Sequence, residues 1–268
     1  MKHLIKFIIL ICVCISFFNP FNTHNYQTQA KNENKPMMAI VIDDYGSYDQ
    51  SGVKLLARCT EPLTCAVLPN TENSEFHANL MHDLGHEIIL HMPMEAYVHL
   101  PEDWYGPIYI KNSDSPETAT QKLKHCLEKF PNVKGFNIHI GSGVSQNQSL
   151  MESIYNYANT HDLFFLDSRT VETHATEEAC KLTKSTYLGR DVFLEADKNR
   201  TYDGVRKRLL EGAEIAKQKG YSIVIGHVGA EGGENTAKAI LDTMKTINDM
   251  NVQIVPLSKI YEYIKTKN

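Results

Sequence analysis

After Pro36 the sequence alternates between short apolar runs rich in β-branched residues and longer segments with helical periodicity. Short apolar runs bounded by turn residues are typical of buried parallel strands, because crossover helices cover the faces of such a sheet. We expect strands at residues 39–42, 63–68, 86–91, 133–140, 163–166, 191–194, 222–225 and 252–255. Seven or eight βα units in series predict an α/β fold, either a barrel or an open doubly wound sheet. We favour a distorted or incomplete parallel (β/α) barrel of about seven strands.

The segments between these strands predict helices and one long loop. Helices are expected at residues 47–57, 76–84, 115–130, 150–158, 173–184, 205–216 and 240–247. Ser47 and Gln50 have the spacing of a capping box for the first helix. Apolar residues four apart, Phe76, Leu80 and Leu84, predict the second helix, which is expected to end at Gly85. Pro93 is expected to end the third strand, and residues 96–114 to form a long loop of the kind that often covers a binding site.

The N-terminal residues have the pattern of a secretory signal, with Lys2 and Lys6 before a 12-residue apolar run at 7–18. A membrane-spanning helix needs about 20 apolar residues, whereas a signal peptide needs fewer. We therefore expect a signal peptide at 1–30, cleaved after Ala30, a polar tether at 31–36 and a catalytic domain at 37–268. This predicts an exported protein of the extracellular space, periplasm or cell envelope. The alternative is an uncleaved anchor, so membrane contact is expected only through this segment.

The composition excludes one class of partner. The sequence has 27 Lys and Arg and 32 Asp and Glu, interspersed, with a formal net charge of −5. It has no basic stripe of the kind that binds nucleic acid, so we expect no nucleic-acid partner. Nothing in the sequence predicts the oligomeric state.

Four cysteines remain once the signal is removed: Cys59, Cys65, Cys126 and Cys180. After export they could form one or two disulfides, with the first two closest in sequence. The alternative, which we favour, is that they are buried as small hydrophobic side chains.

Polar side chains follow several of the predicted strands. The strand ends carry Asp43 and Asp44, His91, Asn137 and His139, Asp167 and Arg169, and His227. In a parallel barrel the carboxyl ends of the strands meet at one mouth, where catalytic groups collect. Two adjacent acids repel each other unless a cation or a shared proton lies between them. The alternative for the acid pair is a helix-capping residue with a solvated neighbour.

A single histidine at a strand end is usually structural, but three at one mouth beside an acid pair indicate a site. Asp44, His91 and His139 form a ligand set that suits zinc and accepts other first-row divalent ions. Three protein ligands leave positions for water and substrate. Asp43 is then the candidate base and His227 the candidate acid.

The remaining polar residues near these strand ends have supporting roles in this hypothesis. Arg169 either orients the base through a charge-assisted hydrogen bond or pairs with a surface acid. Glu95, Asn137, Ser142 and Asp167 are expected to contact the substrate or to support the ligands.

Six motifs in order along the chain resemble the divergent polysaccharide deacetylase family, over residues 36–258: residues 43–46, 85–95, 137–142, 164–170, 190–194 and 225–227. The resemblance implies a branch of the chitin and peptidoglycan deacetylases. These proteins have a distorted (β/α) barrel and use a divalent metal to remove N-acetyl groups from aminosugars. It further implies that Asp43 is the base, that Asp44 and His91 are ligands, and that His227 is the acid.

The chain departs from the wider superfamily at four points. A second ligand histidine is expected four residues after His91, but Glu95 stands there, and the arginine-bearing third motif is replaced by the segment with His139. We therefore expect His139 to be the compensating ligand and Glu95 to support a ligand or contact the sugar. Glu195 and Ala196 replace an expected Asp-Asn, and Val228 replaces a proline.

Three functions fit these residues. The leading one is an exported metal-dependent hydrolase that cleaves the acetamide of an N-acetylated polysaccharide or oligosaccharide, with zinc as the first candidate metal. The second is a non-catalytic glycan-binding or cell-envelope scaffold on the same barrel, which the replacement by Glu95 favours and the retention of Asp43 and His227 opposes. The third is a metal-dependent hydrolase of another amide or ester, which shares all of these residues.

Overall fold

The computed structural model describes residues 35–196 and 200–267. The expected signal peptide and residues 31–34 of the expected tether lie outside this part of the chain. Within it, no helix is both long and apolar enough to cross a membrane. The residues from Pro36 onward form one compact unit.

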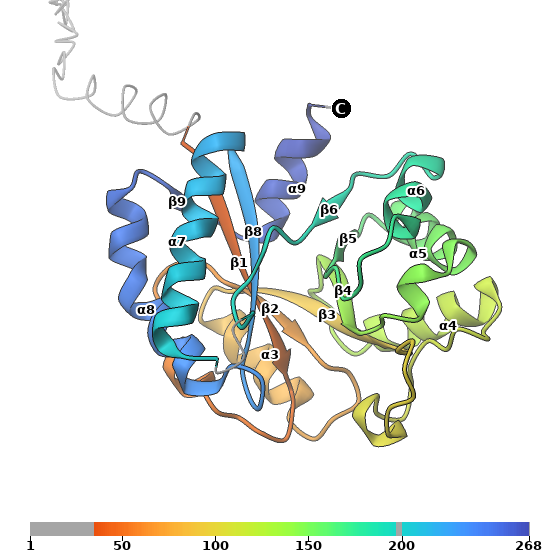
Figure 1. Ribbon diagram of the computed structural model, residues 1–268. Helices are drawn as coiled ribbons and strands as arrows, with labels where there is room; N and C mark the ends of the chain where they lie inside the picture. The colour runs from red at the N-terminus through yellow and green to blue at the C-terminus, as the bar shows by residue number, and fades with distance from the viewer. Residues whose placement is uncertain (1–34, 197–199, 268) are drawn as a thin grey trace, which may run out of the picture. The chain divides into compact units, whose positions relative to one another are not determined.

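The centre of this unit is a parallel sheet (Figure 1). Its strands follow the order β6-β5-β4-β3-β2-β1-β8-β7, and β9 pairs with the beginning of β1. Within the described residues no ladder joins the edge strands β6 and β7, so the sheet curls without closing. The prediction of an incomplete (β/α) barrel is confirmed. The strands are β1 Met37–Tyr45, β2 Thr64–Val67, β3 Glu87–Met94, β4 Gly135–Ile140, β5 Phe164–Asp167, β6 Leu188–Gly189, β7 Val192–Phe193, β8 Tyr221–His227 and β9 Gln253–Ile254.

Helices follow most of the strands and, except for α9, pack on the outside of the curled sheet (Figure 1). They are α2 Val53–Leu56, α3 Ser74–Asp83, α4 Pro116–Leu127, α5 Gln148–Thr160, α6 Ala175–Leu182, α7 Tyr202–Lys219, α8 Gly233–Asp249 and α9 Leu257–Lys265. Two short 3₁₀ turns, Glu102–Trp104 and Val144–Gln146, interrupt the loops. Every helix predicted from periodicity is present, and α9 is an addition that the sequence analysis did not predict.

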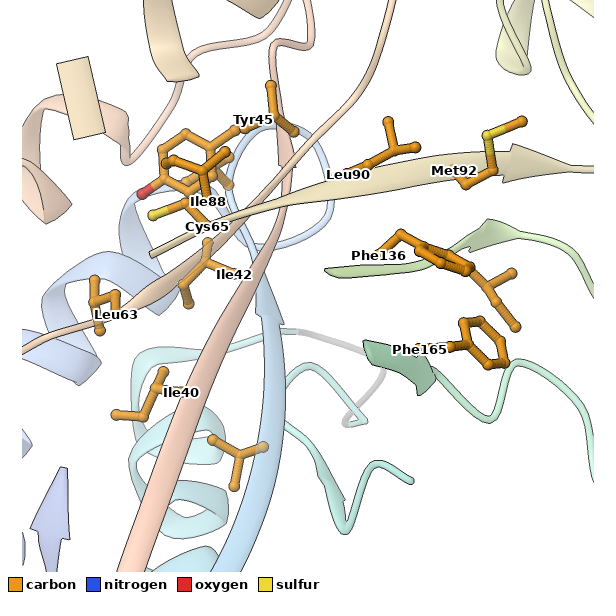
Figure 2. Close-up of a cluster of buried hydrophobic side chains, with 14 of the residues drawn as sticks. Ile40, Ile42, Tyr45, Leu63, Cys65, Ile88, Leu90, Met92, Phe136 and Phe165 are labelled. Carbon is orange, nitrogen blue, oxygen red and sulfur yellow. The ribbon is translucent and has the colours of Figure 1, made fainter. Parts of the chain in front are cut away.

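Two apolar layers form because side chains alternate across each strand. On β1, Ile40 and Ile42 belong to the outer layer between sheet and helices, part of which is shown in Figure 2. Ala39 and Val41 belong to the inner layer, which fills the barrel. Leu257 and Ile260 of α9 join that inner layer. The barrel interior is therefore a packed core at the amino ends of the strands, and α9 helps to fill it.

All four cysteines of the described chain are buried and free, which agrees with the favoured interpretation as small hydrophobic side chains. Cys65 lies in the outer layer beside Tyr45 and Ile42, as Figure 2 shows.

One local prediction about a helix start was wrong, and the buried side of another helix differs from its apolar spacing. The helix α2 begins at Val53 without a side-chain cap, because the Ser47 hydroxyl donates to the carbonyl of Asp49 instead. On α3, Phe76 is 62% exposed and Leu84 is 47% exposed. The buried side of α3 instead contains His77, whose Nδ1 accepts a hydrogen bond from the Gly46 amide at 2.9 Å and so fixes the rotation of the helix.

The third strand does not end at Pro93 but continues to Met94. The carbonyl of Pro93 accepts a hydrogen bond from Ile110 N, whereas the carbonyl of Met94 accepts one from Gly141 N after β4. The backbone of Pro93 therefore faces away from β4, at a position beyond the last residue paired with β2. A proline is tolerated there because the β3–β4 ladder needs no N–H from it.

Candidate metal and proton-transfer site

The alternation along the strands brings the polar residues of the mouth to one face. Asp43 continues the inward-facing series of Ala39 and Val41 on β1. By the same spacing, His91 follows Ile89 on β3, and His227 follows Ile225 on β8. Asn137 and His139 alternate with outward-facing Phe136 and Ile138 on β4. Five polar side chains thus lie above the inner core.

Asp44 would face the outer layer if β1 were regular, because its neighbour Asp43 faces inward. The register between β1 and β2 shifts between Ile42 and Tyr45, however, and the backbone of Asp44 is left-handed, with φ 67°. Bulges of this kind redirect a side chain next to a functional site. Both acids therefore reach the mouth, while Tyr45 returns to the outer core.

Three potential ligand atoms converge at the mouth. Asp44 Oδ1 lies 3.4 Å from His91 Nε2 and 3.3 Å from His139 Nδ1, and the two imidazole nitrogens are 3.1 Å apart. Nitrogen and oxygen ligands bound to zinc at about 2.0–2.1 Å in a tetrahedron lie roughly 3.3 Å from one another. These three residues also form the group of potential metal ligands found in the described chain.

The hydrogen bonds around this group fit a bound cation. His91 donates from Nδ1 to Asn137 Oδ1 at 2.7 Å, and His139 donates from Nε2 to the carbonyl of Trp104 at 3.3 Å. Because these N–H groups are used outward, His91 Nε2 and His139 Nδ1 carry lone pairs, which point toward each other and toward the Asp44 carboxylate. Asp44 Oδ1 is buried and has no hydrogen-bond partner among the described residues. Lone pairs arranged in this way fit zinc or another divalent ion.

The electrostatics of the site also favour positive charge. Burial acts to raise the pKa of Asp44, but the imidazoles of His139 and His91 outweigh it and hold that pKa well below its usual value. Burial acts to lower the pKa of His91, and the charges of Asp43 and Asp44 raise it overall. Two acids in one buried pocket therefore attract either a proton or a metal ion.

Asn137 joins the candidate base to a candidate ligand. Its amide nitrogen donates to Asp43 Oδ1 at 2.8 Å, and its amide oxygen accepts from His91. Oδ2 of Asp43 lies 3.8 Å from His91 Nε2 and 3.9 Å from His227 Nε2. These distances are too long for hydrogen bonds, so one carboxylate oxygen remains free to accept a proton.

The candidate acid has a buried partner that the sequence analysis noted only as a departure. Glu195, after β7, accepts hydrogen bonds from His227 Nδ1 at 3.1 Å, from His227 N at 2.9 Å and from Thr236 Oγ1 at 2.6 Å. Burial of His227 opposes its charge, but the hydrogen bond and charge of Glu195 raise the pKa of the imidazole to about 9. His227 therefore carries a proton near neutral pH, with Nε2 facing Asp43.

Arg169 does not orient the base. Its side chain donates to Tyr187 Oη and to the carbonyl of Arg190, and it lies 3.5 Å from Glu177. Of the two predicted roles, the pairing with a surface acid is the one observed, and Asn137 holds the base instead.

Asp167 holds the turn that carries Arg169. It accepts hydrogen bonds from Arg169 N at 2.8 Å and from Tyr187 Oη at 2.9 Å. These bonds fix the left-handed backbone of Arg169, with φ 50°. Asp167 is not among the described residues that line the cavity, and its expected role in contacting the substrate or supporting a ligand stays a prediction.

Glu95 and Ser142 hold the long loop. Glu95 Oε2 accepts from Asn112 N at 2.6 Å, and Ser142 Oγ accepts from Tyr97 N at 3.0 Å. Neither residue lines the cavity, and Glu95 is not in the group of three converging ligands. Both therefore position the segment that carries Trp104, and their expected role in contacting the substrate or supporting a ligand stays a prediction.

The mouth opens into a cavity of about 890 Å³. Asp43, Asp44 and the three histidines form its polar floor. Tyr48, 94% exposed, and Trp104, 59% exposed, present aromatic rings around it. The cavity can hold a ligand much larger than an acetyl group.

The protein is therefore an open parallel (β/α) barrel with two acids and three histidines gathered at its carboxyl mouth. The chain belongs to the divergent polysaccharide deacetylase family, whose sequence profile matches residues 40–261.

The chain is 28% identical over 194 residues to the protein YibQ of Escherichia coli (strain K12), covering 71% of this chain and 58% of YibQ. It therefore spans less than two thirds of that relative's length. A crystal structure of a protein from Agrobacterium tumefaciens C58 shares the fold, with a TM-score of 0.76, 21% identity, and coverage of 85% of this chain and 90% of that one. The catalytic domain of a peptidoglycan N-acetylglucosamine deacetylase from Eubacterium rectale ATCC 33656 has a TM-score of 0.50 and 15% identity, over 84% of this chain and 90% of that one.

Proposed function

We propose that this protein is an exported, metal-dependent hydrolase that removes N-acetyl groups from a polysaccharide of the cell envelope. The observation that carries the proposal is the convergence of Asp44, His91 and His139 within 3.4 Å of one another, beside a free carboxylate oxygen of Asp43. Membership in the deacetylase family supports the reaction class. The sequence pattern of residues 1–30 supports export.

A divalent ion held by Asp44, His91 and His139 would polarise the acetyl carbonyl and make a water molecule more acidic. Asp43 then takes a proton from the attacking water through Oδ2, since Oδ1 is engaged by Asn137. His227 gives its Nε2 proton to the amine nitrogen as the C–N bond breaks, while Glu195 holds Nδ1. The products are acetate and the free aminosugar.

The cavity supports a glycan substrate. Exposed aromatic faces such as those of Tyr48 and Trp104 pack against apolar C–H surfaces while polar groups at their edges stay solvated. A cavity of about 890 Å³ has room for more than one sugar.

Metal analysis and acetate release test the proposal together. The exported chain should bind about one divalent ion, and the loaded protein should release acetate from peptidoglycan or from chitin oligomers. Asp43→Asn and His227→Ala should each lower the rate by about a hundredfold or more and keep the metal. Asp83→Asn, the same change at an exposed acid of α3, serves as the control and should retain full activity.

The scaffold alternative makes the opposite prediction. A metal-loaded protein that binds these glycans but releases no acetate from any of them would favour it over the hydrolase. Loss of metal from Asp43→Asn would instead show that the roles of the two acids are exchanged.

A further inference from the structure

Two arginines lie together on one wall of the cavity. Arg169 follows β5 and Arg190 precedes β7, and each donates a hydrogen bond to the main-chain carbonyl of the other, at 3.1 Å and 2.8 Å. Arg190 Nε also donates to the carbonyl of Ser168 at 2.7 Å. These bonds hold two guanidinium groups side by side at the mouth, across the opening between β6 and β7.

The charge of this arginine pair is poorly balanced. Among the described residues, Arg169 has one carboxylate within 4 Å, that of Glu177. Both side chains are well exposed, so this ion pair adds little stability. In the described part of the chain, Arg190 has no carboxylate at that distance, and no hydrogen bond uses its Nη1. Burial and the neighbouring charge of Arg169 lower the pKa of Arg190, against the more distant carboxylates of Asp167, Asp43 and Glu195. Burial also opposes the charge of Arg169, but Tyr187, Asp167 and Glu177 raise its pKa overall, so the deficit of negative charge lies mainly at Arg190. An anion placed between the two groups would relieve this repulsion.

The arginine pair is close to the reacting groups. The ring of Phe193 lies between Arg190 and the candidate acid His227. Arg190 Cζ is 5.0 Å from the centre of this ring, and the His227 ring is 5.3 Å from it, edge to face. Among the described residues that line the cavity, Arg169 and Arg190 are the only lysines or arginines. Besides Asp43 and Asp44, the acidic residues among them are Glu72, Asp103 and Glu231. These three belong to other loops, and Glu231 already pairs with Arg200 at 2.6 Å, so the two guanidinium groups occupy one wall of their own.

We infer that Arg169 and Arg190 form a subsite for an anionic group, so that the substrate is an acidic N-acetylated glycan with a carboxylate or phosphate near the reacting acetamide. The inference rests on the proposed function, because the acetamide must lie between Asp43 and His227 while the anion meets the arginines. Guanidinium groups suit this task, since their planar donors match the two oxygens of a carboxylate or phosphate. A neutral chitin-like chain would leave the pair unmatched.

Binding to matched ligands tests the subsite without relying on turnover. The full chain carrying Asp43→Asn, loaded with zinc, is titrated with three oligosaccharides of equal length. One carries a lactyl carboxylate on an N-acetylated sugar, one has that carboxylate converted to an amide, and one carries a phosphate. At low salt, the carboxylate or the phosphate ligand should bind about tenfold more tightly than the amide. This advantage should shrink as salt increases, because screening weakens the attraction at an accessible site.

The arginine variants should remove the preference. Arg169→Gln and Arg190→Gln should each bring the charged and neutral ligands to within about twofold, while zinc content stays unchanged. Arg190→Lys keeps the charge without the fork and should retain part of the preference. Lys181→Gln removes one positive charge from α6, outside the cavity, and should change nothing.

Equal binding of all three ligands by the chain with both arginines would overturn the subsite, as would a preference that survives in both glutamine variants. The proposed function fails separately: if no glycan loses acetate but the charge preference is present, the subsite stands and the hydrolase does not. If charged and neutral ligands bind equally and release acetate equally, the hydrolase stands and the subsite does not.

Discussion

His227 Nδ1 lies 3.1 Å from Glu195 Oε2, and the side chain of Glu195 is fully buried. A buried carboxylate in this position fixes the ring of the candidate acid with Nε2 toward Asp43 and stabilises its charged form. The backbone of His227 and the hydroxyl of Thr236 engage the other carboxylate oxygen, so the partner itself is held rigidly.

This arrangement predicts the alkaline limit of activity. Since the pKa of His227 is raised to about 9, the acid should stay protonated at neutral pH, and activity should fall as pH rises through that value. Glu195→Gln removes the charge that opposes the effect of burial, so the pKa should drop and the alkaline limit should move to lower pH. The rate as a function of pH, together with an NMR titration of His227 in metal-free protein, measures both effects.

Stability should follow the same titration in metal-free protein. The pKa of His227 is about 9 in the folded chain, above its ordinary value of about 6.5. The protonated imidazole therefore adds its full share to the free energy of unfolding below about pH 6.5, and this share is lost as pH rises to about 9. An unchanged NMR titration in Glu195→Gln would show that another group holds the proton.

Metal binding should require His139, whereas loss of the Glu95 carboxylate should only weaken it. His139→Ala removes one of the three converging ligands and should abolish binding of zinc while the fold persists. Glu95→Gln changes a residue that accepts a hydrogen bond from the loop, so it should retain the metal at no more than about tenfold to a hundredfold weaker affinity. Calorimetric titration with zinc after chelation measures both. The reverse result would make Glu95 the third ligand.

Asn137→Asp should impair both metal binding and turnover. The new carboxylate can still accept from His91, but it cannot donate to Asp43 and repels that carboxylate in a buried place. We expect metal affinity and activity each to fall by about tenfold to a hundredfold. Asn156→Asp, at an exposed position of α5, is the matched control. Equal metal affinity and activity in the two variants would show that Asn137 does not connect Asp43 to His91 in function.

Removal of an unpaired buried hydroxyl should not weaken the fold. Within the described part of the chain, the hydroxyl of Tyr155 is buried without a hydrogen-bond partner, while its ring packs against Phe165. Tyr155→Phe keeps the ring and should leave the free energy of unfolding unchanged or raise it by about 1 kcal/mol. Denaturant unfolding measures the change, and a loss of more than about 1 kcal/mol would reveal a partner for the hydroxyl.

The fold and most of the site could be predicted because both depend on strand periodicity. Asp43, His91, His139 and His227 stand at strand ends in positions that alternation turns inward, so the parallel sheet alone brings them together. Asp44 is different, since its inward direction depends on a bulge and a left-handed backbone that no local pattern shows.

Other features depend on contacts between distant segments. Glu195 could not be assigned from its neighbours, because its role arises where the end of β7 meets β8 and α8. The rotation of α3 is fixed by Gly46, 31 residues before His77, which spacing within the helix cannot reveal. The helix α9 did have a signal, in the apolar residues Leu257, Ile260 and Ile264, and the sequence analysis overlooked it.

The pairing of β9 with Met37 and Met38 has a practical consequence. The first described residues and the helix α9 that follows β9 both join the sheet at its amino edge, whereas the site lies at the other end of β1. At about 3.3 Å per residue, Met37 and Asp44 are roughly 23 Å apart along the strand. A tag, linker or solid support attached at either end of the domain should therefore leave the mouth with the candidate site accessible to a polymer.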